Sequence, residues 1–160
     1  MIEAVTIFGR NYPIVEEATD TVQFNEDRVS IPFTIRPTDS LLKEFLSDLL
    51  FGKLEEIYEE IKQEGKIDLL GNLDFEIAKR IDNKKGRIAK LKGNKIIMKI
   101  DAVALPENIL RYIVAHEIAH VANKRHTKKF WKTVELICPN FRATHVCMQQ
   151  LTSLGNLEKE

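Results

Sequence analysis

The chain has 160 residues, a length that suits one domain with a substantial core. Its 24 basic and 24 acidic residues give a formal net charge of zero, which carries no overall signal for nucleic-acid or membrane binding. The N-terminus lacks the pattern of a signal peptide and no apolar run reaches membrane-spanning length, so we expect a cytoplasmic protein. Its two cysteines, Cys138 and Cys147, are then expected to be buried thiols and not a disulfide.

The first part of the chain is rich in β-forming residues. Residues 2–8, 21–24 and 29–33 are predicted strands, and the polar turn at 25–28 is expected to join the last two as a hairpin. Pro32 lacks an N–H donor and therefore suits an edge position in the sheet.

A long amphipathic helix is predicted next. Residues 38–40 read Thr-Asp-Ser and offer helix caps, and apolar side chains then repeat at helical spacing from Leu41 to Ile61. A glutamate-rich face marks the solvent side, and Gly65 fits the end of the helix. We expect this helix to pack its apolar face on the core.

Strand patterns return after this helix. Residues 73–81 form one candidate strand, and residues 87–91 and 95–100 form two more. Gly93-Asn94 lies between the last two and is a typical two-residue hairpin turn.

The stretch from 113 to 131 reads IVAHEIAHVANKRHTKKFW and holds three of the chain's four histidines. Residues four apart on a helix share a face, so His116 and His120 can direct two ring nitrogens to one metal ion. Glu117 lies beside them and can take a proton from water. The surrounding helix is so apolar that it must be buried, where an unpaired carboxylate is costly. A metal explains this pattern; the alternative is a set of core histidines that only form hydrogen bonds.

His126 is the expected third ligand. Its distance from His120 equals that in the pattern H-E-x-x-H-x-x-G-x-x-H, with Asn123 in place of the glycine. Asn readily adopts the left-handed conformation, so Asn123 is expected to end the helix and turn the chain back. The alternatives are a solvated His126 in a basic run, or His145 as the third ligand. Zinc with three protein ligands keeps a fourth position open, as catalytic sites require.

Two more helices are predicted after the motif. Thr127 can cap the first, Pro139 closes it, and residues 141–151 form the second. Between Lys84 and Lys132 there are thirteen basic and three acidic residues, a net charge of +10 around the motif. Such a run is usually a solvated face, but it can also attract an acidic substrate or a nucleic-acid backbone. Aromatic residues for base stacking are not interleaved with it, so nucleic-acid binding is expected to be weak.

Four separated motifs match one known pattern. They are F-G-x-x-Y at 8–12, H-E-x-A-H at 116–120, His126 followed by Phe-Trp at 130–131, and P-x-F at 139–141. In these motifs the chain resembles the YgjP-like metallopeptidases, relatives of the SprT-like proteases among the zincins. That family usually carries R-W-G-S-C before the last strand, where this chain has Gly-Arg-Ile-Ala-Lys at 86–90.

The resemblance implies one α+β, zincin-like domain over residues 1–152, followed by a polar tail at 153–160. In it a small, mostly N-terminal and central sheet would accompany the long helix and the H-E-x-x-H helix. It further implies a zinc-dependent peptidase acting on a peptide or protein, with zinc held by His116, His120 and His126 and with Glu117 as general base. Strand 95–100 would form an exposed edge that receives the substrate as an added strand.

The sequence alone does not decide which residue stabilises the oxyanion, which of three functions the chain has, or its oligomeric state. Tyr112, Arg87 and His145 are candidates for stabilising the oxyanion, and the sequence does not choose among them. Two other functions are compatible with the residues: a latent metal-binding module that docks on nucleic acid or protein through its basic half, and a metal-dependent hydrolase of a non-peptide bond. The sequence carries no signal for an oligomeric state.

Overall fold

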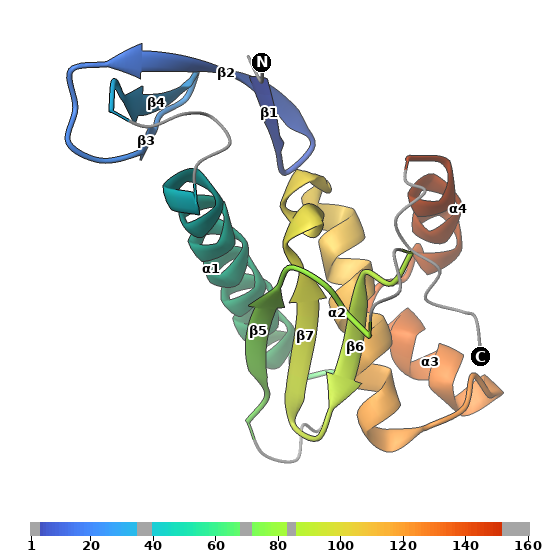
Figure 1. Cartoon of the computed structure of the whole chain (residues 1–160). Coiled ribbons are helices and arrows are strands. Elements are labelled where there is room, and N and C mark those ends of the chain that lie inside the picture. The colour runs from blue at the N-terminus through green and yellow to red at the C-terminus, as the bar shows by residue number, and fades with distance from the viewer. Residues whose placement is uncertain (1–3, 35–39, 68–71, 83–85, 152–160) are drawn as a thin grey trace.

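A computed structural model describes residues 4–34, 40–67, 72–82 and 86–151 (Figure 1). The first four strands are β1 (Ala4–Ile7), β2 (Arg10–Glu17), β3 (Gln23–Phe24) and β4 (Val29–Pro32). Helix α1 (Ser40–Glu64) precedes β5 (Asp74–Ala78), β6 (Ala89–Lys92), β7 (Lys95–Lys99) and the 3-10 helix η1 (Ile100–Ala104). Helices α2 (Glu107–Ala122), α3 (Lys128–Ile137) and α4 (Phe141–Leu151) follow. One hydrophobic core extends through these elements, which confirms the predicted single α+β domain. The predicted tail at 153–160 lies outside the described residues.

The N-terminal strands form a sheet with the order β1-β2-β4-β3. The antiparallel pairing of β3 with β4 confirms the predicted hairpin, whereas β2 was not predicted. Pro32 was expected at an edge position, but it lies on β4, which is between β2 and β3 in the sheet. The sheet tolerates this proline because it is the last residue of β4, and β3 pairs only with Val29 and Ser30.

The turn between β1 and β2 joins this sheet to the start of α2. The N–H groups of Phe8 and Gly9 donate to the carbonyls of Val103 and Ala104 over 2.8 and 2.9 Å. Gly9 has a φ of +87°, and a Cβ atom there would lie 3.0 Å from Cγ of Pro106. Only glycine fits both the backbone conformation and this close approach. The F-G-x-x-Y motif therefore fixes the entry of α2, the helix that carries the histidine motif.

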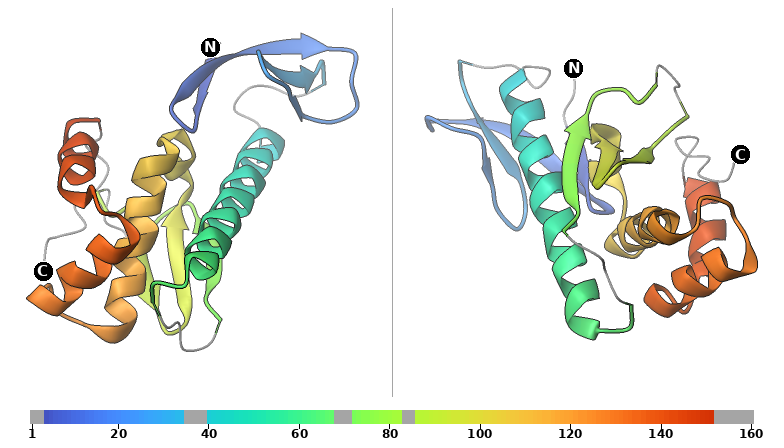
Figure 2. Two further views of the ribbon diagram at one scale, coloured as in Figure 1. Left: turned by 180° about the vertical axis from the view of Figure 1, so that it is seen from behind. Right: turned by 90° about the horizontal axis from the view of Figure 1, so that it is seen from below.

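Helix α1 buries one apolar face, as predicted. Gly65 follows its last residue with a φ of +64°, in agreement with the predicted end of the helix. Its predicted caps at 38 and 39 lie outside the described residues. The central sheet has the order β5-β7-β6, and α1 and α2 cover the same face of it (Figure 2). Strands β6 and β7 are antiparallel around Gly93-Asn94, which confirms the second predicted hairpin.

The prediction that strand 95–100 is an exposed edge is wrong. β7 is the middle strand, with β6 antiparallel on one side and β5 parallel on the other. The hairpin is a local signal, but the β5 pairing depends on how α1 packs and is not visible in the strand itself. The strand next to α2 with an unpaired edge in the described sheet is β6.

Pro106 is the N-cap of α2. Cys138 is buried as predicted, but Cys147 is exposed, and both are free thiols. Among the described helices, none combines the length and the apolar composition that crossing a lipid bilayer requires.

Candidate metal centre

The three predicted ligands converge at the C-terminal end of α2. His116 and His120 lie on the helix and His126 lies in the loop that leads to α3. One ring nitrogen of each histidine lies within 4.8 Å of the other two. His116 and Glu117 are only 1% and 3% exposed, and the other two histidines are half-buried. The structure thus brings together the three histidines that the sequence indicated.

The loop that returns His126 to the helix does not use the predicted left-handed residue. Asn123 has φ −135° and ψ 107°, which is an extended conformation. In this conformation its carbonyl oxygen lies 3.2 Å from Nδ1 of His120. The next helix begins as predicted, since Oγ1 of Thr127 accepts a hydrogen bond from the N–H of Phe130 over 3.4 Å. His126 is therefore held between the end of one helix and the cap of the next.

The tautomer of His120 follows from its partner. A carbonyl oxygen can only accept, so Nδ1 of His120 carries a proton, and in the neutral ring Nε2 then presents its lone pair. Nε2 of His126 lies 3.2 Å from that atom. Two nitrogens bound at ~2.0–2.1 Å to a tetrahedral zinc ion would be about 3.3 Å apart, close to this separation. The pair has the spacing that a shared ion requires.

His116 supplies an independent test of the fit. Both of its ring nitrogens are buried and neither has a hydrogen-bond partner among the described residues. Burying an unsatisfied polar atom costs roughly 1–3 kcal/mol, and a bound ion would satisfy one of the two. Three imidazoles are a donor set that suits zinc and other first-row divalent metals. The residues present therefore fit a metal ion.

An aromatic side chain packs beneath all three ligands. The ring of Phe130 is fully buried, and its centroid lies 5.0, 4.6 and 4.7 Å from those of His116, His120 and His126. In the sequence, the Phe-Trp motif was identified only as part of the family resemblance. Its contact with the histidines could not be predicted, because that contact depends on how α3 packs on α2.

Helix α4 closes the other side of this cluster. Phe141 stacks on Trp131 with a centroid distance of 5.3 Å, and Nδ1 of His145 lies 3.0 Å from the hydroxyl of Tyr112. His145 is not in the three-histidine group, so the structure separates it from the metal ligands. Tyr112 is fully buried, which removes it from contact with a substrate in this conformation.

Two surface pockets open on either side of the histidines. The first, here called the β6 groove, has a volume of about 460 Å³ and runs between β6 and the end of α2; its lining residues are Arg87, Leu91, Gly93, Asn94, Glu117, His120, Val121 and Lys124. The second, the α3 pocket, has a volume of about 540 Å³ and is lined by His126, Thr127, Lys128, Trp131, Lys132, Glu135, Phe141 and Arg142.

Glu117 faces the β6 groove beside its neighbouring ligand. One of its carboxylate oxygens, Oε1, lies 3.7 Å from Nδ1 of His116. Arg87 lines the same groove, and its Nε donates to the carbonyl of Ala89 over 3.2 Å. Of the three oxyanion candidates, Arg87 is therefore the one that lines the pocket of Glu117.

Comparisons with known proteins agree with this geometry. The family model for the YgjP-like metallopeptidase domain matches residues 2–151. The crystal structure of the metallopeptidase zymogen abylysin from Pyrococcus abyssi is similar in fold, with a TM-score of 0.51 and 23% identity over 61% of this chain and 94% of that one. The zymogen of jannalysin from Methanocaldococcus jannaschii gives a TM-score of 0.45 and 23% identity over 62% and 97% of the two chains. No curated protein matches the sequence. A metal-dependent peptidase is the general activity that the matched family supports, and the chain belongs to this YgjP-like family of metallopeptidase domains.

Proposed function

We propose that this chain is a zinc metallopeptidase in which His116, His120 and His126 hold the ion and Glu117 is the general base. The observation that carries the proposal is the convergence of three ligand nitrogens within 4.8 Å beside a buried carboxylate. Zinc is favoured because all three donors are imidazoles. Three protein ligands leave a coordination position for water or substrate, which distinguishes a catalytic from a structural site.

The bound ion and the residues around it would have different roles in peptide hydrolysis. When bound, zinc would polarise the scissile carbonyl and lower the pKa of a water molecule toward 7. Glu117 then accepts the proton of the attacking water and passes it to the leaving amine. The Asn123 carbonyl holds the His120 ring in the orientation that presents Nε2.

The edge of β6 is the proposed site of substrate pairing. The N–H of Lys99 donates to the carbonyl of Ile88 over 2.8 Å. In this register the backbone N–H and C=O groups of residues 88, 90 and 92 point toward β7, and those of the residues between them point away from it. The backbone groups of Ala89 and Leu91 therefore point to the open edge, and Leu91 lines the β6 groove opposite Glu117. An extended peptide can pair there through its main chain and cross the histidines. Its arrival displaces Arg87 from the Ala89 carbonyl and frees that guanidinium for the substrate.

Replacing the proposed base tests the function. Glu117→Gln keeps the shape of the side chain but cannot accept a proton, so this variant should keep one zinc per chain and lose peptidase activity by roughly 10²–10⁴-fold. Glu26→Gln is the matched control, because Glu26 is an exposed carboxylate between β3 and β4 that lines neither pocket. Metal content is measured by elemental analysis and activity on an unfolded protein substrate. Loss of zinc with activity in Glu117→Gln, or full activity of that variant, would contradict the assignment.

A further inference from the structure

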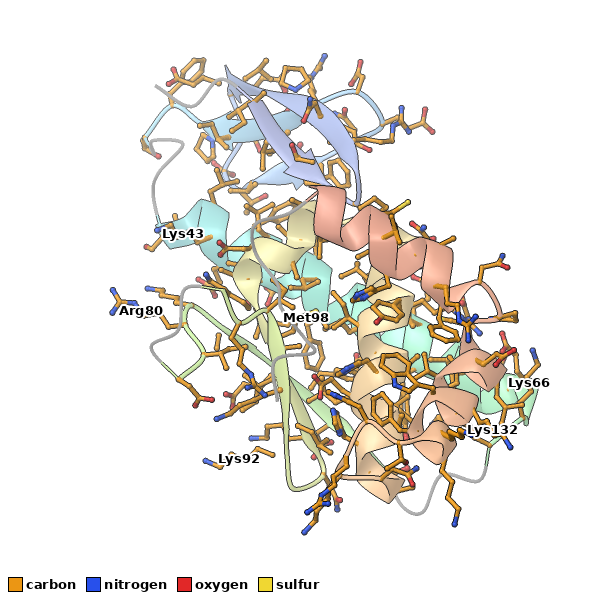
Figure 3. The ribbon with its side chains drawn as sticks, turned by 90° about the vertical axis from the view of Figure 1, so that its right-hand side faces the viewer. Lys43, Lys66, Arg80, Lys92, Met98 and Lys132 are labelled. Carbon is orange, nitrogen blue, oxygen red and sulfur yellow. The ribbon has the colours of Figure 1, made fainter. Side chains whose placement is uncertain are left out.

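The two pockets beside the histidines are rimmed by positive charge. Arg87 and Lys124 line the β6 groove, and among its described lining residues the only acid is the proposed general base, Glu117. The α3 pocket carries three cations, Lys128, Lys132 and Arg142, against the single acid Glu135. Figure 3 shows Lys132 on α3, while Lys43 lies on α1 on the opposite side of the view. Positive charge is therefore concentrated on both sides of the metal centre.

Some basic residues elsewhere in the fold are held in ion pairs with acidic side chains. Lys90 pairs with Asp82 at 2.6 Å, Lys95 with Glu76 at 3.3 Å, and other pairs hold further cations in the same way. Within the described parts of the chain, by contrast, no ion pair involves a cation of the β6 groove or the α3 pocket. Their charge is left to act on whatever enters the two pockets.

The positions of the pockets relate this charge to the scissile bond. His120 lines the β6 groove and His126 lines the α3 pocket, and their Nε2 atoms are 3.2 Å apart. A peptide that crosses the histidines therefore leaves residues on one side of the scissile bond in the groove and residues on the other side in the pocket. Side chains on both sides meet cations.

We propose that the preferred substrate is an acidic peptide segment, with Asp or Glu on both sides of the bond that is cut. The inference rests on the proposed function, since it assigns the substrate class of that site. A peptide is favoured over a nucleic acid because the outward backbone groups of Ala89 and Leu91 match an extended main chain. The buried carboxylate of Glu117 in the same groove also repels a phosphate backbone more than it repels a peptide.

Binding separates this inference from turnover. Affinities are measured by fluorescence anisotropy on the zinc-loaded Glu117→Gln protein, using labelled peptides of equal length in which a central Ala-Ala is flanked on each side by two Glu, two Gln or two Lys residues, so that the Glu peptide offers four charged contacts. An exposed charge pair contributes roughly 0.2–1 kcal/mol, or about 1.4- to 5-fold, so four contacts together should favour the Glu peptide about tenfold over the Gln peptide. This preference should weaken as salt is raised from about 50 to about 300 mM. The reason is that the Debye length, ~10 Å at 0.1 M, shortens as the ionic strength rises, so exposed charges are screened.

Charge-removing variants locate the recognition. Arg87→Gln with Lys124→Gln, added to the same protein, should reduce the Glu preference severalfold, whereas Lys43→Gln should leave it unchanged. Equal affinity for the Glu and Gln peptides, or no binding of either, overturns the inference. Tighter binding of a single-stranded DNA oligonucleotide of the same net charge also overturns it, in favour of a nucleic-acid site.

The two proposals fail in different ways. Hydrolysis of an unfolded protein by the wild type, together with equal binding of the Glu and Gln peptides, would remove the acidic preference and leave the peptidase standing. A clear preference for the Glu peptide in a protein that cuts no substrate would support the recognition site and remove the peptidase.

Discussion

Replacement of Phe130 by leucine should weaken the metal site through packing alone. Phe130 is fully buried, and its ring contacts the rings of all three proposed ligands at centroid distances of 4.6–5.0 Å. Leucine is smaller and lacks the flat face, so we expect a loss of about 1–1.5 kcal/mol in the free energy of unfolding. Groups that orient metal ligands are typically worth 10–100-fold in affinity, and this indirect contact should lower zinc affinity about tenfold.

The assay compares two leucine variants. Phe75→Leu is the matched control, because Phe75 is a core phenylalanine, 8% exposed, on the β5 edge of the sheet away from the histidines. Urea unfolding of the metal-free proteins should show similar losses of stability in both variants. Zinc competition with a chelating dye should show weaker binding only in Phe130→Leu. Unchanged zinc affinity in that variant, with the expected loss of stability, would refute the claim that the ring positions the ligands.

Three further predictions concern the surrounding residues. His126→Ala should lose most of its zinc in elemental analysis, whereas His145→Ala should keep it, because only His126 joins the ligand group. Thr127→Ala removes the cap of α3 and should cost about 1 kcal/mol in urea unfolding, with weaker zinc binding because the cap holds the adjacent loop. Burial raises the pKa of the Cys138 thiol above its ordinary value, although the charge of Arg111 partly opposes this. The folded state thus favours the neutral thiol, so its contribution to stability is present below pH ~9 and is lost as pH rises further, a slope that Cys138→Ala should flatten.

Each of these predictions has an opposing result. Equal zinc content in His126→Ala and wild type would reject the third ligand, and a loss confined to His145→Ala would transfer the role to that residue. Unaltered unfolding of Thr127→Ala would show that its hydroxyl does not stabilise α3. The same alkaline loss of stability in Cys138→Ala and wild type would assign the pH dependence to other groups.

Local patterns predicted the elements that carry the candidate site. The i, i+4 spacing of His116 and His120 required only a helix, and α2 provides it. Thr127 at a helix start and Gly93-Asn94 between two strands are signals that a few adjacent residues decide. The spacing of His126 was sufficient to place it with the other ligands, even though the residue expected to turn the chain does so differently.

Non-local packing decided what the sequence did not reveal. Asn123 is extended instead of left-handed, and its carbonyl lies beside the His120 ring. β7 is the central strand because β5, which follows α1 in the chain, pairs with it in parallel. Strand β2 escaped prediction because its proline and its charged residues weaken the strand pattern, while pairing with β1 and β4 stabilises it. The contact between Tyr112 and His145 depends on how α4 folds over α2.

The number and type of zinc ligands in the wild-type protein decide whether the three histidines form an open metal site. X-ray absorption at the zinc edge of the protein, loaded with one equivalent of the metal, reports the number and type of ligands. We predict three imidazole nitrogens from His116, His120 and His126 and one oxygen from solvent, with one imidazole lost in His126→Ala. Two or fewer imidazoles in the wild type, or a fourth protein ligand that closes the site, would contradict it.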